Sequence, residues 1–329
     1  MRHHDLKVFF FDRHRGAEIF TRAVQGAYVG FDGDEKNVSL NPFDCRNTPN
    51  NRAFLRRWLK AITMVDDALS EKEIGRAVTT AFDYLKPEER ILKNLYKSCF
   101  SPTGNMRREL FRWINPDQYG NIFNAENDSL DLASKRFMAF DFTHIFEDET
   151  LAPAVISYIM HRIMAETGDT GVPSLIMIDE TAPMLKHPMF RDYFIIGLQE
   201  GRKKRQAYLC AFQQPNIIDK LGVGEVIRGQ CQTVIFFRNP QAMPEDYANW
   251  NLTQREIDFI FGKSYRDFPY AILLSRPATG ESVILDVDLS GLGPYLKLYN
   301  SGRKNVLLVE ELIKEYGEAN FVTKYLNIG

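Results

Sequence analysis

The chain has few cysteines, and they do not form a recognisable motif. Cys45, Cys99, Cys210 and Cys231 are far apart in the sequence and make no CxxC pair. No histidine stands at a zinc-ligand spacing from any of them. This usage does not suggest a metal site, and it indicates reduced, buried thiols in a cytosolic protein.

Long apolar runs and an excess of one charge are absent as well. No apolar run reaches the roughly 18 residues that a membrane-spanning helix requires. The formal net charge is -2, so no strong basic field marks the chain as a nucleic-acid binder, and any DNA contact has to come from local loops. The 329 residues are 44% hydrophobic and 26% charged, which is typical of a folded soluble protein with one large domain or two smaller ones.

The sequence also lacks a GxxxxGK[ST] phosphate-binding loop. A Gly-Lys-Ser tripeptide occurs at 262–264, but Ile257 occupies the position of the first glycine. This tripeptide follows a predicted helix (253–261) rather than a strand, which is the wrong geometry for a phosphate site. A serine-hydrolase triad is unsupported too, because no GxSxG nucleophile elbow is present.

What the chain does contain is a series of short apolar, β-rich runs separated by helical stretches. This alternation predicts an α/β fold with a largely parallel sheet and helices on both faces. A further run at 282–287 is predicted to pair with the last of these strands as a hairpin. The predicted strands are 8–11, 137–140, 174–178, 207–211, 233–237 and 270–274.

One segment, from 51 to 115, contains nothing that resembles a strand. Phe54 and Trp58 belong to an apolar stripe with helical spacing at its start. We therefore predict a small all-helical insertion, which is either a packing lobe or a partner-binding or lid element. This divides the chain into residues 1–50, the start of the α/β core, the insertion at 51–115, and residues 116–329, the rest of the core with a C-terminal hairpin and helices.

The strongest chemical signal is the pair Asp179 and Glu180, directly after the predicted strand 174–178. Ligands of open α/β sheets bind at the carboxyl ends of the strands. A nucleotide hydrolase needs one carboxylate to hold Mg²⁺, often through water, and a second to orient or deprotonate the attacking water. We assign Asp179 to the Mg²⁺ and Glu180 to the water. The alternative is a strand that ends in a solvated acidic turn.

Two amides follow the next strand, at Gln213 and Gln214. An amide at the tip of a neighbouring strand can reach a γ-phosphate or the attacking water, and Gln213 is the better placed of the two. We assign Gln213 a catalytic role and Gln214 a nucleotide contact. The alternative is a turn residue before Pro215.

A basic cluster, Arg202 to Arg205, lies between these two strands, at the end of a predicted helix. A guanidinium can stabilise the charge that spreads over a γ-phosphate. Arg202 is therefore a candidate arginine finger from this subunit or from its neighbour, and Arg205 a candidate nucleotide contact. Favourable interaction with the helix dipole is the structural alternative.

Several short runs along the chain occur in a distinctive order, and each of them is weak by itself. In this order they resemble the landmarks of the CagE/TrbE/VirB family of type IV secretion and conjugation ATPases. The resemblance extends from about residue 8 to 305. Its landmarks are 10–16 (FFDRHRG), 40–43 (LNPF), 51–55 (NRAFL), 120–124 (GNIFN), 140–143 (FDFT), 178–180 (IDE), 201–203 (GRK), 213–215 (QQP), 233–240 (TVIFFRNP) and 285–292 (LDVDLSGL).

The resemblance implies a RecA-like motor domain that binds ATP and Mg²⁺ and powers type IV secretion, conjugative transfer and pilus assembly. It implies a homo-hexamer at the cytoplasmic face of the bacterial inner membrane. The membrane association would be peripheral, through the inner-membrane and ATPase components of the secretion apparatus.

Two departures from the family pattern affect this interpretation. The phosphate-binding loop and its flanking elements are not in the sequence, so we expect a part of a motor that is inactive by itself, and whether the chain is an enzyme stays open. Phe212 stands where the family has a threonine before the sensor glutamine. The alternatives are a non-catalytic interaction module of the secretion apparatus and a coupling-protein-like DNA pump that contacts single-stranded DNA.

Overall fold

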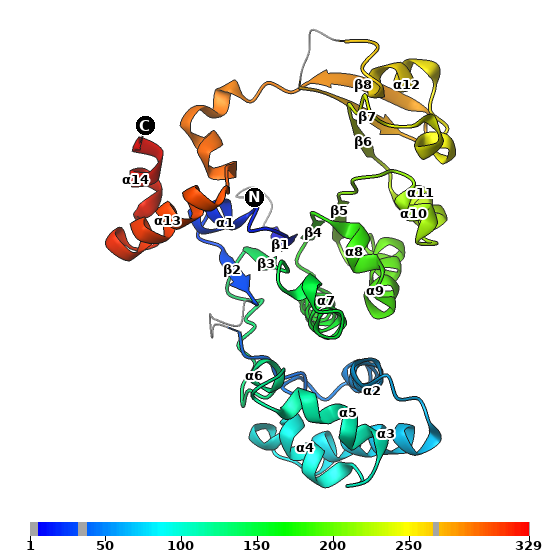
Figure 1. Ribbon diagram of the computed structural model, residues 1–329, viewed down its shortest axis with the longest axis vertical. Coiled ribbons are helices and arrows are strands. Elements are labelled where there is room, and N and C mark those ends of the chain that lie inside the picture. The colour runs from blue at the N-terminus through cyan, green and yellow to red at the C-terminus, as the bar shows by residue number, and fades with distance from the viewer. Residues whose placement is uncertain (1–5, 32–37, 266–269, 329) are drawn as a thin grey trace.

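A five-stranded parallel sheet forms the centre of the molecule (Figure 1). The computed structural model describes residues 6–31, 38–265 and 270–328. The strands lie in the order β2-β3-β1-β4-β5, so β4 is in the interior of the sheet. Their bounds are β1 (Lys7–Asp12), β2 (Ala27–Gly30), β3 (Phe137–Asp141), β4 (Ser174–Ile178) and β5 (Gln206–Cys210).

Helices surround this sheet and fill most of the chain between its strands. The α-helices are α1 (Glu18–Ala23), α2 (Pro49–Thr63), α3 (Ala68–Asp83), α4 (Leu92–Cys99), α5 (Asn105–Ile114), α6 (Gly120–Phe123), α7 (Leu151–Thr170), α8 (Thr181–Leu185), α9 (Pro188–Glu200), α10 (Ile217–Lys220), α11 (Gly224–Gln230), α12 (Gln254–Ile260), α13 (Arg303–Tyr316) and α14 (Phe321–Asn327). The 3₁₀ helices are η1 (Pro87–Glu89), η2 (Ile145–Glu147), η3 (Pro244–Trp250) and η4 (Ser290–Tyr299). The predicted α/β fold with a largely parallel sheet and a helical insertion is confirmed.

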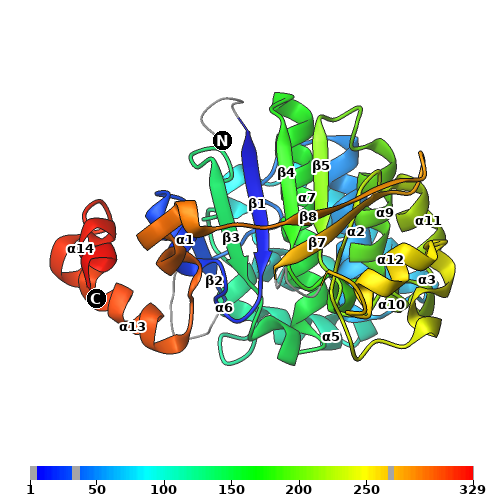
Figure 2. The same cartoon turned by 90° about the horizontal axis from the view of Figure 1, so that it is seen from above.

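One face of the sheet is covered by α7 and α9, which lie behind the strands in the view of Figure 2. Ile176 and Ile178 of β4 point into this core and are buried. α7 is apolar around most of its circumference because it packs against the sheet on one side and against α2 on the other. On the opposite face, α1 covers β2 and β3. Phe20 of α1 makes an edge-to-face contact with Phe137, with 5.5 Å between the ring centroids.

The helices α2 to α6 form a lobe below the sheet in Figure 1, within the range 49–123. Trp58 joins this lobe to α7, because its indole Nε1 donates a hydrogen bond of 3.0 Å to the Ala154 carbonyl. Trp113 ties α5 to α2 through a 3.2 Å bond to the Ile62 carbonyl. Both indoles are fully buried, so the lobe and the sheet share one hydrophobic core.

A second sheet corrects the predicted topology. Strands β6 (Val234–Phe237), β7 (Ala271–Arg276) and β8 (Glu281–Asp286) form an antiparallel sheet of their own. The placement of 233–237 and 270–274 in the parallel sheet was therefore wrong, because an apolar run of four or five residues does not specify its neighbour or its direction. The β7–β8 hairpin is confirmed, with Gly280 in the turn at φ 69°.

One strand of the parallel sheet, β2, was not predicted. It was missed because its four residues are only half-buried and end in Gly30. At the end of the chain, α13 and α14 pack onto α1 in a small separate core around Ile19, Val309 and Phe321.

Among the helices that the structure describes, none is both long enough and apolar enough to pass through a bilayer.

Candidate functional site

The candidate site lies at the carboxyl edge of the parallel sheet, where the ends of all five strands meet. Backbone hydrogen bonds continue past the ends of the strands. The Asp179 amide donates to the Phe11 carbonyl at 3.1 Å, and the Thr181 amide donates to the Ala211 carbonyl at 3.1 Å. The turn after β4 is therefore fixed between β1 and β5, which determines where Asp179 and Glu180 lie.

The Glu180 carboxylate has a partner on each oxygen. Gln213 Nε2 donates to Oε1 at 3.1 Å, and the guanidinium of Arg13 pairs with Oε2 through Nη1. The Glu180 side chain is 20% exposed, so it is accessible to a small reactant although both oxygens are engaged. The structure thus brings Glu180 and Gln213 together, as the sequence analysis expected, and adds a cation that it did not include.

Asp179 lies beside Glu180 and is open to solvent. Partial burial, and to a smaller extent the negative charge of Glu180, raise the pKa of the Asp179 carboxyl above its ordinary value. A bound cation would offset both effects, because it stabilises the ionised carboxylate.

The carboxylates of the site can be compared with the ligands that a bound metal ion requires. In the described ranges, no three His, Cys, Asp or Glu side chains gather closely enough to hold one. The exposed carboxylate of Asp179 fits the lighter demand of Mg²⁺, which takes one or two carboxylates together with water and substrate phosphates.

Arg13 was missed as a functional residue, although it lies inside the motif 10–16. It is the first residue after β1, so its guanidinium enters the site from the strand next to β4. Its guanidinium carbon also stands 5.5 Å from the centre of the Phe146 ring. The available signal was positional: a cation directly after a strand that neighbours the carboxylate-bearing strand.

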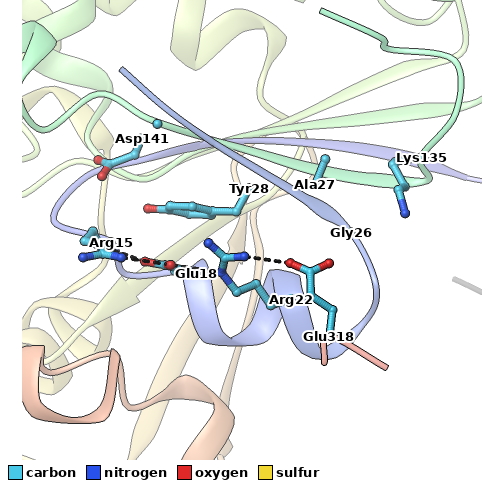
Figure 3. A pocket seen from close by; sticks show the side chains of 10 residues that line it. Arg15, Glu18, Arg22, Gly26, Ala27, Tyr28, Lys135, Asp141 and Glu318 are labelled. Atoms are coloured by element: carbon cyan, nitrogen blue, oxygen red, sulfur yellow. Dashed lines mark hydrogen bonds and ion pairs between the residues drawn. The ribbon is translucent and has the colours of Figure 1, made fainter. Parts of the chain in front are cut away.

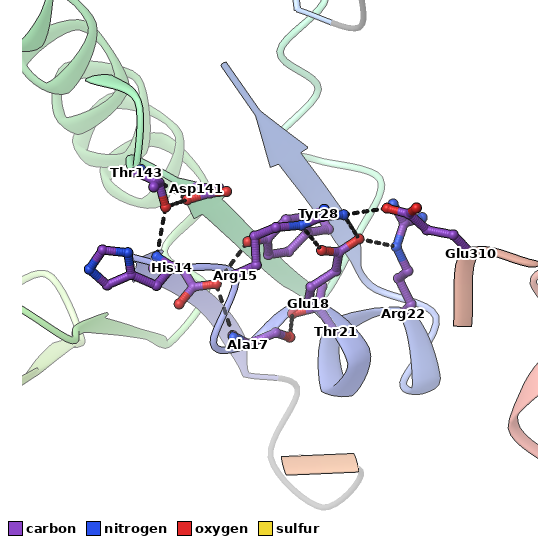
Figure 4. A network of polar contacts seen from close by, with 11 residues as sticks. His14, Arg15, Ala17, Glu18, Thr21, Arg22, Tyr28, Asp141, Thr143 and Glu310 are labelled. Atoms are coloured by element: carbon purple, nitrogen blue, oxygen red, sulfur yellow. Dashed lines mark hydrogen bonds and ion pairs between the residues drawn. The ribbon is translucent and has the colours of Figure 1, made fainter. Parts of the chain in front are cut away.

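The loop after β1 is held by a network of polar contacts (Figure 4). The His14 amide donates to Thr143 Oγ1 at 2.6 Å, and that hydroxyl donates to Asp141 at 2.5 Å. Asp12 Oδ2 accepts from the Ala17 amide and from the Tyr28 hydroxyl, each at 2.9 Å. Asp12 is buried, and this burial raises the pKa of its carboxyl to about 6.

A polar pocket of about 310 Å³ lies next to this network, at the β2 and β3 side of the sheet (Figure 3). Both acidic and basic side chains line it. Arg15 pairs with Glu18 and with Glu310 of α13, and Arg22 pairs with Glu318. The mixed charges neutralise one another, so the pocket has no strong preference for an anion or a cation.

The basic cluster lies at the other edge of the sheet. Arg202 and Arg205 are in the turn that precedes β5, whereas Gln213 follows the carboxyl end of that strand. The Ser174 amide at the start of β4 donates to the Arg205 carbonyl, which fixes this turn at the amino edge. The structure therefore does not bring Arg202 and Arg205 to Glu180 of the same chain. Gln214 is exposed beside Gln213.

No model of a known protein family matches the chain. The type IV secretion system protein virB4 of Bartonella henselae is 29% identical over 321 residues, which are 95% of this chain and 40% of that protein. The conjugal transfer protein TrbE of Rhizobium radiobacter is 24% identical over 331 residues, 97% of this chain and 39% of that protein. The chain thus spans about 40% of the length of the curated relatives it matches.

A solved structure supports the fold. VirB4 of Thermoanaerobacter pseudethanolicus superposes with a TM-score of 0.66 at 12% identity, over 86% of this chain and 81% of that one. The RecA-like fold predicted from the sequence agrees with this match. The predicted resemblance to the CagE/TrbE/VirB type IV secretion proteins is confirmed.

Proposed function

We propose that this chain, a relative of the VirB4 and TrbE proteins over almost its whole length, supplies the hydrolytic half of an ATP site in a type IV secretion motor. One observation carries the proposal: Glu180 and Gln213 meet at the carboxyl edge of a parallel sheet, with Asp179 exposed beside them. Phosphoryl transfer to water needs a carboxylate that orients the water, an amide next to it and a second carboxylate for Mg²⁺.

Each side chain has a defined task in this proposal. Asp179 would hold Mg²⁺, directly or through water, and the ion would neutralise charge on the phosphates. Glu180 accepts a proton from the attacking water through a carboxylate oxygen. Gln213 holds Glu180 from Oε1 and orients the water with its amide. Gln214, exposed next to it, is within the same turn and is proposed to contact the nucleotide.

The sheet has an open place for a phosphate-binding segment. β5 is the last strand on its side among the described residues, and Leu209 in it is 49% exposed. Leu209 pairs in register with Met177 and lies on the same face of the sheet. A strand–loop–helix segment with a GxxxxGK[ST] sequence could pair with β5, cover this apolar face and bring its loop to the carboxyl edge. This supports a site that such a segment completes.

We propose that Arg202 and Arg205 act on the ATP site of a second copy of the chain. Both side chains are exposed at the amino edge, so they can reach a site on a neighbouring subunit but not Glu180 of their own chain. A ring such as a homo-hexamer would place them there, since a head-to-tail interface joins two different edges. We propose that such an assembly works at the cytoplasmic face of the inner membrane, bound to other secretion components.

The test requires what we call the extended protein: this chain joined at its amino end to a strand–loop–helix segment that contains GxxxxGK[ST]. We expect Mg²⁺-dependent ATP hydrolysis, and Glu180→Gln should lower kcat by about 100-fold or more. Glu225→Gln is the matched control, because Glu225 is exposed on α11 and takes no part in the contacts of Glu180. A Glu180→Gln variant that turns over as fast as this control would remove Glu180 from the mechanism.

The second candidate is a non-catalytic interaction module of the secretion apparatus. It is favoured by one observation, the absence of GxxxxGK[ST] from the 329 residues. Calorimetric titration of the extended protein with Mg-ATP, together with a turnover assay, distinguishes the two. Both candidates predict little binding to this chain, but only the motor predicts tight binding and turnover by the extended protein.

A further inference from the structure

Arg13 makes an ion pair that the proposed roles of Glu180 and Gln213 do not require. We propose that Arg13 is a positioning residue, which holds the Glu180 carboxylate in its hydrolytic orientation from the side opposite Gln213. This inference rests on the proposed function and deepens it. It assigns a role to the first residue after β1, on the strand adjacent to the one that bears the carboxylates.

The contacts of Gln213 and Arg13 are made with different oxygens of the Glu180 carboxylate. Gln213 arrives from β5 and binds Oε1, and Arg13 arrives from β1 and binds Oε2. A carboxylate held by donors on both oxygens loses its freedom to rotate about its terminal torsion. The remaining lone pairs then point in fixed directions, which is what a group that must accept a proton from a bound water needs.

Arg13 itself is fixed in place. Its guanidinium lies over the ring of Phe146, 5.5 Å from the ring centre, and its Nε is buried with no hydrogen-bond partner among the described residues. The side chain is nevertheless 30% exposed at the site, so the pair is in reach of a reactant.

The backbone that presents Arg13 is strained. The next two residues, His14 and Arg15, have φ values of 62° and 59°, in the left-handed region that side chains with a Cβ rarely occupy. The cost is offset by the bond from the His14 amide to Thr143 and by the bond from the Ala17 amide to Asp12. This turn follows directly after the residue that pairs with Glu180.

The first experiment asks whether the pair exists in the chain as it is, without nucleotide. Arg13→Gln, Glu180→Gln and the double variant form a double-mutant cycle, measured by chemical unfolding. If the two side chains interact, the product of the single-variant effects on the unfolding equilibrium constant should exceed the effect of the double variant by about 3-fold or more. Additive effects would overturn the inference.

The second experiment separates positioning from a merely structural role, and it uses the extended protein. Arg13→Ala should lower kcat by about 10-fold or more while KM changes by less than about 2-fold, because the carboxylate is displaced but ATP binding is not. Arg13→Lys should recover most of the rate, since an ammonium keeps the charge at Oε2. Arg13→Ala in the Glu180→Gln background should have no further effect. Arg303→Ala, an exposed arginine on α13, is the matched control.

The outcomes distinguish this inference from the proposed function. No ATP hydrolysis by the unsubstituted extended protein contradicts the proposed function, and the role of Arg13 with it. Hydrolysis that Glu180→Gln abolishes but Arg13→Ala leaves unchanged contradicts the role of Arg13 only. Two other results also overturn the positioning role of Arg13. One is a loss of rate in Arg13→Ala that Arg13→Lys does not recover, and the other is an Arg13→Ala variant in which KM is raised but kcat is unchanged. Circular dichroism of each variant identifies any that fail to fold, and if Arg13→Ala is one of them, Arg13→Gln takes its place with the same expected loss of rate.

Discussion

The side-chain amide of Gln213 donates a 3.1 Å hydrogen bond to Glu180 Oε1, across 33 positions of sequence. The two residues follow the carboxyl ends of β5 and β4, and the pairing of these strands places them next to each other. A turn residue before a proline would not need this contact. The bond therefore favours a working pair over two unrelated polar side chains at the edge of a sheet.

The first prediction concerns this bond. Gln213→Ala in the extended protein should lower kcat by about 10- to 100-fold, because one of the two donors that hold the carboxylate is removed. Steady-state ATPase kinetics measure it. Gln254→Ala is a matched control, since that glutamine lies on the surface of α12 and bonds to Asp258. Equal rates in the two variants would show that the amide does not act in hydrolysis.

The second prediction concerns Arg202, which the structure places at the amino edge of the sheet. If it acts on the neighbouring subunit, Arg202→Ala and Glu180→Gln should each be inactive as extended proteins but active as a mixture. Random mixing gives about a quarter of the interfaces an intact Arg202 beside an intact Glu180, so about a quarter of the full rate is expected. ATPase assays of mixed and unmixed samples measure it, and a mixture as inactive as its components would contradict a role between subunits.

The third prediction concerns the buried carboxyl of Asp12, which has a pKa raised by burial from 3.8 to about 6. The folded state binds this proton more tightly than the unfolded chain, so the Asp12 contribution to stability is greatest below pH 4 and is lost as the pH rises to 6. Since each pKa unit corresponds to about 1.4 kcal/mol, ionised Asp12 costs at most about 3 kcal/mol above pH 7. Asp12→Asn should remove this cost.

Urea unfolding between pH 4 and 8 tests the Asp12 prediction. Asp12→Asn should be the more stable protein at pH 8, and its advantage should vanish near pH 4. Tyr28→Phe should act in the opposite direction, because the Tyr28 hydroxyl bonds to Asp12 Oδ2 and lowers the pKa of that carboxyl. Identical pH profiles for Asp12→Asn and the unsubstituted chain would contradict the assignment.

The fourth prediction concerns Trp58, which connects the helical lobe to α7. Trp58→Ala should lower the free energy of unfolding by about 3–5 kcal/mol, because it leaves a large cavity between α2 and α7. Trp58→Phe should cost less than Trp58→Ala, since a phenyl ring still fills most of the space, although part of the packing and the bond to the Ala154 carbonyl are lost. Chemical denaturation followed by circular dichroism measures both. The control is Met64→Ala, at a side chain that is 78% exposed, and an equal effect there would contradict the role of Trp58.

The sequence determined the local features of the fold because these depend on neighbouring residues. Apolar runs bounded by polar turns fixed β1, β3, β4 and β5, and the helical stripe around Trp58 fixed the start of the lobe. The pair Asp179 and Glu180 followed from one strand and the two residues after it. Gln213 followed from the next strand, and the order of the family motifs made the interpretation specific.

Only the tertiary structure decided which strands are neighbours and which residues share an edge. An apolar run has no direction, so β6 and β7 left the parallel sheet for an antiparallel one without any change in their local pattern. The same holds for the cations. The Arg202 cluster is closer to Glu180 in sequence, but the turn before β5 puts it at the amino edge, while β1 brings Arg13 to the carboxylate across 167 positions. Contacts between distant segments arise from strand pairing, which the sequence of either segment does not encode by itself.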